Sequence, residues 1–132
     1  MRDLQPSFWT LARHGRVVRL TRTREAHPDL AAALAAFEQV LAALADLGDL
    51  RGRSGLLVDL RASPQITDPA VEGALQPFRV RVLDGFAAGA ALVDTLGGRL
   101  QLHRLERIDR AYRTFDDEEE ALAYLDAALD AL

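Results

Sequence analysis

The sequence predicts a single α/β domain built on a mostly parallel sheet, and two features of its 132 residues support this class. Short apolar stretches typical of strands alternate with longer amphipathic stretches typical of helices, a pattern of parallel strands joined by right-handed crossovers. Two strand-like stretches joined by a tight turn come first and add an N-terminal β-hairpin. The predicted order is β-β-α-β-α-β-α-β-α, in one domain over residues 1–132.

The hairpin strands are predicted over residues 7–13 and 16–23, with His14 and Gly15 between them. Glycine accepts the positive φ that a tight hairpin turn needs. In the second strand Val18 and Leu20 share one face, opposite the arginine and threonines that alternate with them. This strand is therefore expected to be wet on one side.

A long helix is predicted next. Pro28 is expected in its first turn, where a missing N–H costs nothing, and Gly48 is expected to end it in a left-handed conformation. Apolar residues spaced by three and four mark its inner face. These are Leu30, Ala33, Leu34, Phe37, Val40, Leu41, Leu44 and Leu47.

Residues 55–60 form a continuous apolar run, which is typical of a buried strand. Asp68 and Pro69 suit the cap and first position of a second helix. Its inner face is predicted to consist of Val71, Leu75, Phe78 and Val82. Pro77 lies inside this helix and clashes with the carbonyl of Gly73, so we expect a kink or a break there.

Residues 86–95 predict the next strand, and its side chains are small enough for a helix, or less often a ligand, to pack closely. A third helix is expected over residues 96–108. The last strand is expected over residues 111–115, and Asp117 with Glu120 forms a capping box for a final helix. That helix is expected to turn inward Leu122, Leu125, Leu129 and Leu132.

The composition excludes several function classes. The chain has no cysteine and no lysine, which rules out disulfides, thiolate catalysis, cysteine-ligated zinc and Schiff-base lysines. The net charge of −4 argues against a nucleic-acid partner. No apolar run reaches the roughly 20 residues of a membrane span, and no signal peptide is present, so a cytoplasmic protein is expected. Early arginines and a late acidic run form two poles that can orient a partner.

Candidate chemistry is sparse. Asp59 at the end of a strand resembles the phosphate-accepting Asp of a response regulator, but the acidic pair and the lysine of that site are missing. We expect Asp59 to accept hydrogen bonds from loop amides or to pair with Arg61. The three histidines, His14, His27 and His103, lack the paired spacing of metal ligands, so no metal or other cofactor is expected. Ser63 lies in no nucleophile motif, so no catalytic set is expected.

A weaker candidate follows the strand over residues 86–95. It combines unpaired backbone amides, the N-terminal end of a helix dipole and a positive charge, which together favour binding of an anion. Tight packing of the two glycines is the alternative and the favoured interpretation. The residues are Thr95, Gly97, Gly98 and Arg99.

Two stretches, GLLVDLRASPQITDPAVEG and YRTFDDEEEALAYL, together with the order of elements, resemble the STAS/SpoIIAA-like superfamily of bacterial anti-anti-sigma factors. The resemblance implies parallel strands side by side in chain order and no enzymatic activity. Family members bind a kinase-like anti-sigma factor and are switched off by serine phosphorylation within Asp-Ser-Ser-Gly. Here Asp68 is followed by Pro69 and Ala70, so the hydroxyls are absent and the usual phosphoswitch is not expected.

The favoured hypothesis is a regulatory, non-catalytic module that binds a protein partner or a second copy. Its candidate interaction or switch loop consists of Asp59, Arg61, Ser63, Thr67 and Asp68. The alternative is a binder of a small apolar or lipid-like ligand, in a cavity between residues 86–91 and the Pro77 break. An enzyme that uses Asp59, Arg61 and Ser63 is the third hypothesis, for which the sequence names no reaction.

Overall fold

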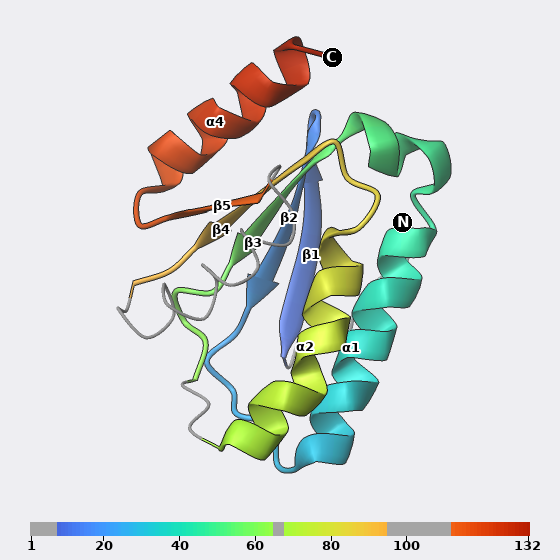
Figure 1. Cartoon of the computed structure of the whole chain (residues 1–132), viewed down its shortest axis with the longest axis vertical. Coiled ribbons are helices and arrows are strands. Elements are labelled where there is room, and N and C mark those ends of the chain that lie inside the picture. The colour runs from blue at the N-terminus through green and yellow to red at the C-terminus, as the bar shows by residue number, and fades with distance from the viewer. Residues whose placement is uncertain (1–7, 65–67, 95–111) are drawn as a thin grey trace.

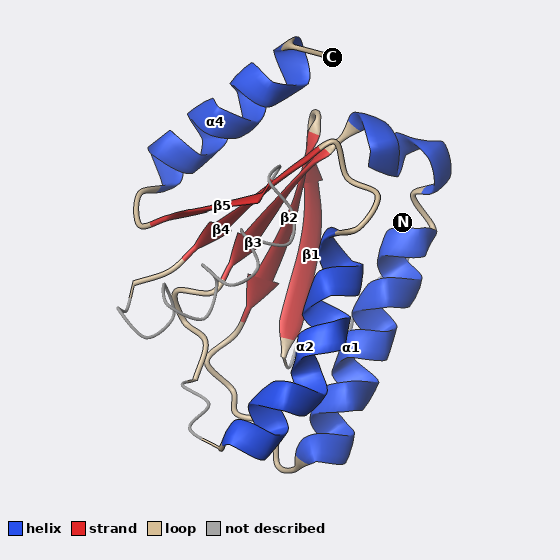
Figure 2. Cartoon of the chain, viewed as in Figure 1, coloured by secondary structure: helices blue, strands red, loops and turns tan. Residues whose placement is uncertain are grey.

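The computed structural model describes residues 8–64, 68–94 and 112–132 as a five-stranded sheet with helices on both faces (Figures 1 and 2). The strands lie side by side in chain order, β1-β2-β3-β4-β5. β1 runs antiparallel to β2, and every later pair is parallel. This confirms the predicted α/β class and topology. The strands are β1 (Trp9–His14), β2 (Val17–Arg22), β3 (Gly55–Asp59), β4 (Ala88–Leu92) and β5 (Tyr112–Phe115).

The β1–β2 turn lies one residue later than expected. His14 pairs with Val17 as part of the ladder, which leaves Gly15 and Arg16 as the two-residue loop. Gly15 has φ +60°, at the first loop position, and Arg16 is not in the left-handed region. The glycine therefore supplies the positive φ as predicted, while His14 belongs to the strand.

Helix α1 (Leu30–Ala45) begins after Pro28 and not with it. The Asp29 side chain accepts a hydrogen bond from the Ala32 amide at 2.8 Å, so Asp29 takes the cap position and Pro28 precedes it. The helix ends at Ala45 with Asp46 as its cap, so the predicted stop at Gly48 lies too late in the chain. Gly48 does adopt the expected positive φ, +56°, and begins the short 3₁₀ helix η1 (Gly48–Arg53).

Helix α2 (Pro69–Leu83) has Asp68 as its cap and continues through Pro77, so the expected break is absent. Pro77 cannot donate a hydrogen bond to the carbonyl of Gly73. Both residues are exposed, which leaves that carbonyl accessible to water. The helix therefore tolerates the proline on its solvent side.

Helix α4 (Glu118–Asp130) has the predicted cap, because the Asp117 carboxylate accepts from the amides of Glu119 and Glu120 at 2.8 and 3.2 Å. Leu125 and Leu129 are buried as predicted. Leu132 lies beyond the last turn and is 75% exposed, so its predicted inward position is wrong. The third helix, predicted over residues 96–108, lies outside the described residues.

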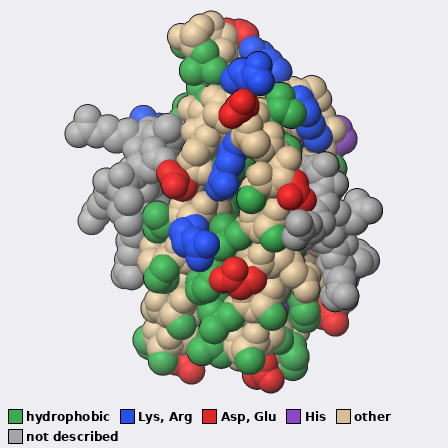
Figure 3. All heavy atoms as spheres, turned by 90° about the vertical axis from the view of Figure 1, so that its right-hand side faces the viewer, with side chains coloured by type: hydrophobic (Ala, Val, Ile, Leu, Met, Phe, Trp, Pro, Cys, Tyr) green, Lys and Arg blue, Asp and Glu red, His purple; other side chains and the backbone are tan. Residues whose placement is uncertain are grey.

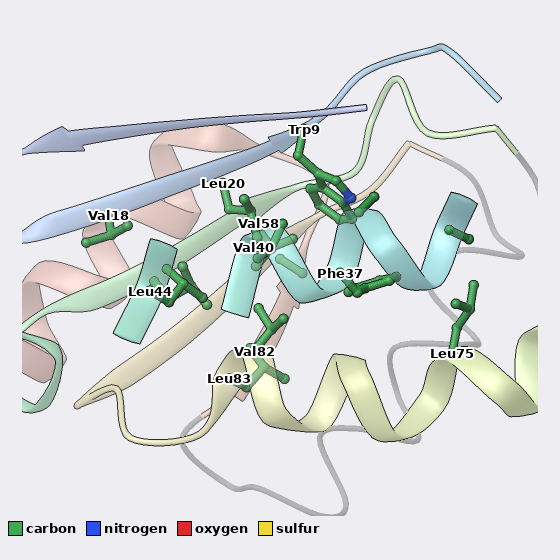
Figure 4. Packing of buried hydrophobic residues seen from close by; sticks show 14 of the residues in the cluster. Trp9, Val18, Leu20, Phe37, Val40, Leu44, Val58, Leu75, Val82 and Leu83 are labelled. Atoms are coloured by element: carbon green, nitrogen blue, oxygen red, sulfur yellow. The ribbon is translucent and has the colours of Figure 1, made fainter. Parts of the chain in front are cut away.

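The sheet buries a separate apolar cluster on each face. The larger cluster packs under α1 and α2 (Figure 4), and its strand residues include Val18, Leu20 and Val58. Residues of the alternate phase, such as Val17 and Leu57, pack under α4. Leu30, which was predicted on the inner face of α1, is 37% exposed because it lies at the first position of the helix.

Candidate functional site

The carboxyl end of β3 carries a set of four charged side chains, the Asp59 network, formed by Arg19, Asp59, Arg61 and Glu118. Arg19 shares the face of β2 with Val17, and Asp59 shares the face of β3 with Leu57; that face is covered by α4. The first turn of α4 brings Glu118 to the same place. Strand alternation and a helix start therefore assemble the network.

The Asp59 carboxylate accepts four hydrogen bonds. Its Oδ1 accepts from the backbone N and from Nε of Arg61, at 3.1 and 3.0 Å. Its Oδ2 accepts from Nη2 of Arg61 and from Nη2 of Arg19, both at 2.8 Å. Glu118 Oε1 accepts from the same two Nη2 atoms, at 2.5 Å from Arg19 and 3.2 Å from Arg61. Two cations and two anions therefore balance.

Electrostatics keep Asp59 ionised. Burial raises the pKa of this carboxyl. Hydrogen bonds from Arg61 and Arg19 lower the pKa by more than burial raises it, so the pKa of Asp59 lies below its ordinary value. Asp59 is 6% exposed and its lone pairs are occupied. The group is therefore a structural acceptor and is poorly placed to act as a general base or as a nucleophile.

The predicted interaction loop is only partly brought together. Asp59 and Arg61 pair as expected, whereas the Ser63 hydroxyl donates to the carbonyl of Pro64 at 3.3 Å. Asp68 caps α2 through the amide of Ala70 at 2.9 Å. Thr67 lies outside the described residues, as do all four residues of the weak anion site, Thr95, Gly97, Gly98 and Arg99.

Two members of the network, Arg19 and Glu118, were not predicted. Arg19 is 40 residues from Asp59 and 99 residues from Glu118. Judged from its neighbours in sequence, Arg19 is typical of the solvent-exposed face of a strand, and Glu118 is typical of the acidic residues found in the first turn of a helix. The only available signal was the shared face of Arg19 and Val17, together with the parallel pairing of β2 with β3.

The small side chains of β4 are explained by packing. All five residues of Ala88–Leu92 are buried. Ala88, Ala90 and Leu92 pack in the cluster under α4, and Ala91 packs in the cluster with Leu83. Gly55 on the neighbouring strand also admits α4 closely, since a Cβ there would lie 3.3 Å from Leu125 Cδ2. The small residues therefore let a helix pack closely against the sheet. This is the first of the two explanations expected for this strand, a helix or a ligand.

The described residues contain no cluster of three or more acidic, histidine or cysteine side chains that could hold a metal ion. His14 is exposed at the end of β1, and His27 lies between the hairpin and α1. His103 lies outside the described residues. Among the helices that the structure describes, none is both long and apolar enough to cross a membrane.

No protein-family model and no curated protein sequence matches the chain. A search of solved structures finds the crystal structure of an anti-sigma factor antagonist from Mycobacterium paratuberculosis, with a TM-score of 0.61 and 16% identity. The match covers 93% of this chain and 98% of the other. The chain has the fold of an anti-sigma factor antagonist. This fold confirms the STAS/SpoIIAA-like resemblance in architecture, and at 16% identity the likeness concerns the fold alone.

Proposed function

We propose that the chain is a non-catalytic regulatory module that binds a protein partner through the outer face of α1 and α2. An anti-sigma factor is the partner that the fold suggests, acting in the cytoplasm. The proposal rests on the scarcity of charged residues on that outer face and on the fold. It also fits the Asp59 network, whose charged groups bind one another.

The outer face of α1 is the observation that carries the proposal. Among the 16 residues of this helix, Glu38 is the only charged one. A helix on the surface normally carries charged side chains on its solvent side, and a helix that is apolar all round is normally covered. Yet Leu30, Ala31 and Ala35 of α1 are exposed. This part of the surface is therefore suited to burial against another protein.

Helix α2 extends the same surface. The two helices pack side by side on one face of the sheet (Figure 1). Ala70, Gly73 and Pro77 of α2 are exposed and uncharged, while Glu72 and Arg79 neutralise each other in an ion pair. Figure 3 shows hydrophobic side chains spread over the side of the molecule on which α1 lies, with isolated charges between them. Arg81 of α2 also lies 3.9 Å from Glu38 of α1. The surface therefore consists of small uncharged residues and paired charges, and the centre of a protein interface is typically poor in charge.

The proposed module works without the usual serine phosphoswitch. Pro69 and Ala70 occupy the first positions of α2, next to the Asp68 cap. Neither side chain has a hydroxyl that a kinase can phosphorylate. Ser63 and Thr67 are the hydroxyl side chains that remain near this position, so a phosphate switch in this loop would use one of them.

The test is affinity capture of the tagged chain from a lysate of its source organism, with two surface variants. Ala35→Arg places a long cation in the centre of the proposed face, and arginine has nearly the helix propensity of alanine. Ala127→Arg is the matched control, because Ala127 is an exposed alanine on α4, on the opposite side of the sheet. Light scattering of each purified variant reports self-association.

The expected result is a reproducible partner, an anti-sigma factor, retained by the wild type and by Ala127→Arg and lost by Ala35→Arg. A dimer that only Ala35→Arg dissociates would assign the face to a second copy of the chain. A monomer that captures nothing reproducible, or a partner that Ala35→Arg still binds, would refute the proposal.

A further inference from the structure

A second polar group of side chains lies at the end of the α1-facing core and has no role in the proposed function. It is the Arg22 cluster, formed by Phe8, Trp9, Arg22 and His27. Arg22 is the last residue of β2 and follows Val18 and Leu20 at the alternate positions that point into the larger apolar cluster. The strand therefore places a cation on its buried face, in line with two hydrophobic residues.

The burial of Arg22 is only partly compensated. The residue is 5% exposed, and its Nη1 donates to the carbonyls of Phe8 and Thr23 at 3.2 and 2.7 Å and to the hydroxyl of Thr23 at 3.5 Å. The guanidinium lies over the rings of Phe8 and Trp9, 5.7 and 5.8 Å from their centroids. No acidic side chain of the described residues forms an ion pair with it, in contrast to Arg19 and Arg61. Burial lowers the pKa of this guanidinium and the negative charge of Glu25 raises it, with burial the larger effect, so the cation is only partly compensated.

Two neighbouring nitrogens are buried without a hydrogen-bond partner: Nε1 of Trp9 and Nδ1 of His27. The Trp9 residue is 6% exposed, and Figure 4 shows its indole nitrogen on the side of the ring away from Val18. The His27 ring stacks on Phe8 at 4.4 Å. Unpaired buried polar groups are rare in native proteins, and here two of them accompany a cation that is only partly compensated.

We propose that the Arg22 cluster binds the carboxylate of a small organic acid. The guanidinium and the indole both offer N–H donors and no acceptor, and the guanidinium is positively charged, so an acceptor that carries negative charge complements both. A carboxylate matches the planar fork of a guanidinium, which can donate two parallel hydrogen bonds. The surrounding rings of Phe8, Trp9 and Phe37 suit an apolar body on that acid. Phe8 and His27 are only partly buried, so these two rings separate the cluster from solvent.

The chain contains one tryptophan, which gives a direct measurement. In a ¹H–¹⁵N spectrum of the full chain, the single indole N–H resonance comes from the proposed site. Titration with sodium acetate and with sodium benzoate is expected to shift this resonance saturably, with tighter binding of benzoate because of its ring. Sodium chloride and inorganic phosphate at equal ionic strength are expected to produce no saturable shift.

Arg22→Gln removes the charge and is expected to weaken benzoate binding roughly tenfold to a hundredfold, the usual loss for a hydrogen bond to a charged group. Arg24→Gln is the matched control, because Arg24 is exposed two residues away, and it is expected to bind like the wild type. If Arg22→Gln does not fold, Trp9→Phe keeps an aromatic ring and removes the donor. Its binding is then measured by calorimetry and is expected to be weaker.

The proposal is overturned if neither carboxylate shifts the indole resonance saturably, if chloride shifts it equally, or if Arg22→Gln and Trp9→Phe bind benzoate as the wild type does. Saturation by phosphate in preference to both acids would also overturn it. None of these outcomes depends on the capture of a protein partner by the α1–α2 face.

Discussion

Replacing Asp59 by asparagine removes the central anion of the Asp59 network with almost no change in size. The new amide side chain keeps one oxygen acceptor, but its other terminal atom becomes an NH₂ that faces the Nη2 donors of Arg61 and Arg19. Two hydrogen bonds of 2.8 Å are therefore replaced by opposed donors. Two cations then share Glu118 as their remaining carboxylate. We expect the folded state to be destabilised.

The structure sets the magnitude of this loss. Removing one partner of a buried ion pair costs about 3–5 kcal/mol. Here the site is less enclosed, since the side chains of Arg19 and Arg61 are 26% and 40% exposed and water can solvate them. We therefore expect the free energy of unfolding to fall by about 2–3 kcal/mol, with a decrease in Tm of about 10 °C. Asp49→Asn, at an exposed site, is the control and is expected to change stability by less than about 0.5 kcal/mol.

The loss also depends on pH in a defined direction. The pKa of Asp59 is lowered in the folded state, so its charge contributes stability above the ordinary carboxyl pKa and loses that contribution as pH falls through the folded pKa. The variant lacks this titration. The difference in unfolding free energy between the wild type and Asp59→Asn is therefore expected to be constant near neutral pH and to shrink in acid.

Urea denaturation of both proteins at a series of pH values measures this difference, because the carboxyl groups outside the Asp59 network contribute equally and cancel. A variant as stable as the wild type at neutral pH would show that the network contributes no net stability. A difference that stays unchanged down to the most acidic condition would show that Asp59 does not carry the charge that stabilises the site.

Two further substitutions test the packing and capping of α4. Leu125→Ala removes a fully buried side chain next to Gly55 and is expected to lower the free energy of unfolding by about 2–5 kcal/mol in urea titrations. Leu132→Ala, at an exposed position, serves as control, and equal losses in the two variants would contradict the packing. Asp117→Ala removes the cap and is expected to cost about 1 kcal/mol. Thermal unfolding measures this cost, and a Tm identical to that of the wild type would count against the cap.

Local patterns were sufficient to predict the elements in the part of the chain that the structure describes. Apolar alternation and continuous apolar runs located the described strands, and the preferences for helix caps identified Asp68 and Asp117 correctly. Pairs close in sequence were also accessible, as for Asp59 and Arg61, because a two-residue separation leaves few alternative partners. The errors occurred where local rules compete: Asp29 displaced Pro28 as the feature that starts α1, and solvent exposure let α2 retain Pro77.

The amino-acid sequence by itself determined the class of fold, the order of the described elements and the absence of thiol and lysine chemistry, since these depend on neighbouring residues and on composition. The three-dimensional arrangement alone decided which distant side chains meet. Arg19 and Glu118 join Asp59 because parallel pairing and the crossover to α4 place them at one edge of the sheet. Arg22 and Trp9 likewise meet through the β1–β2 ladder, where Trp9 lies opposite Arg22. Such contacts depend on register and helix placement, which no local pattern encodes.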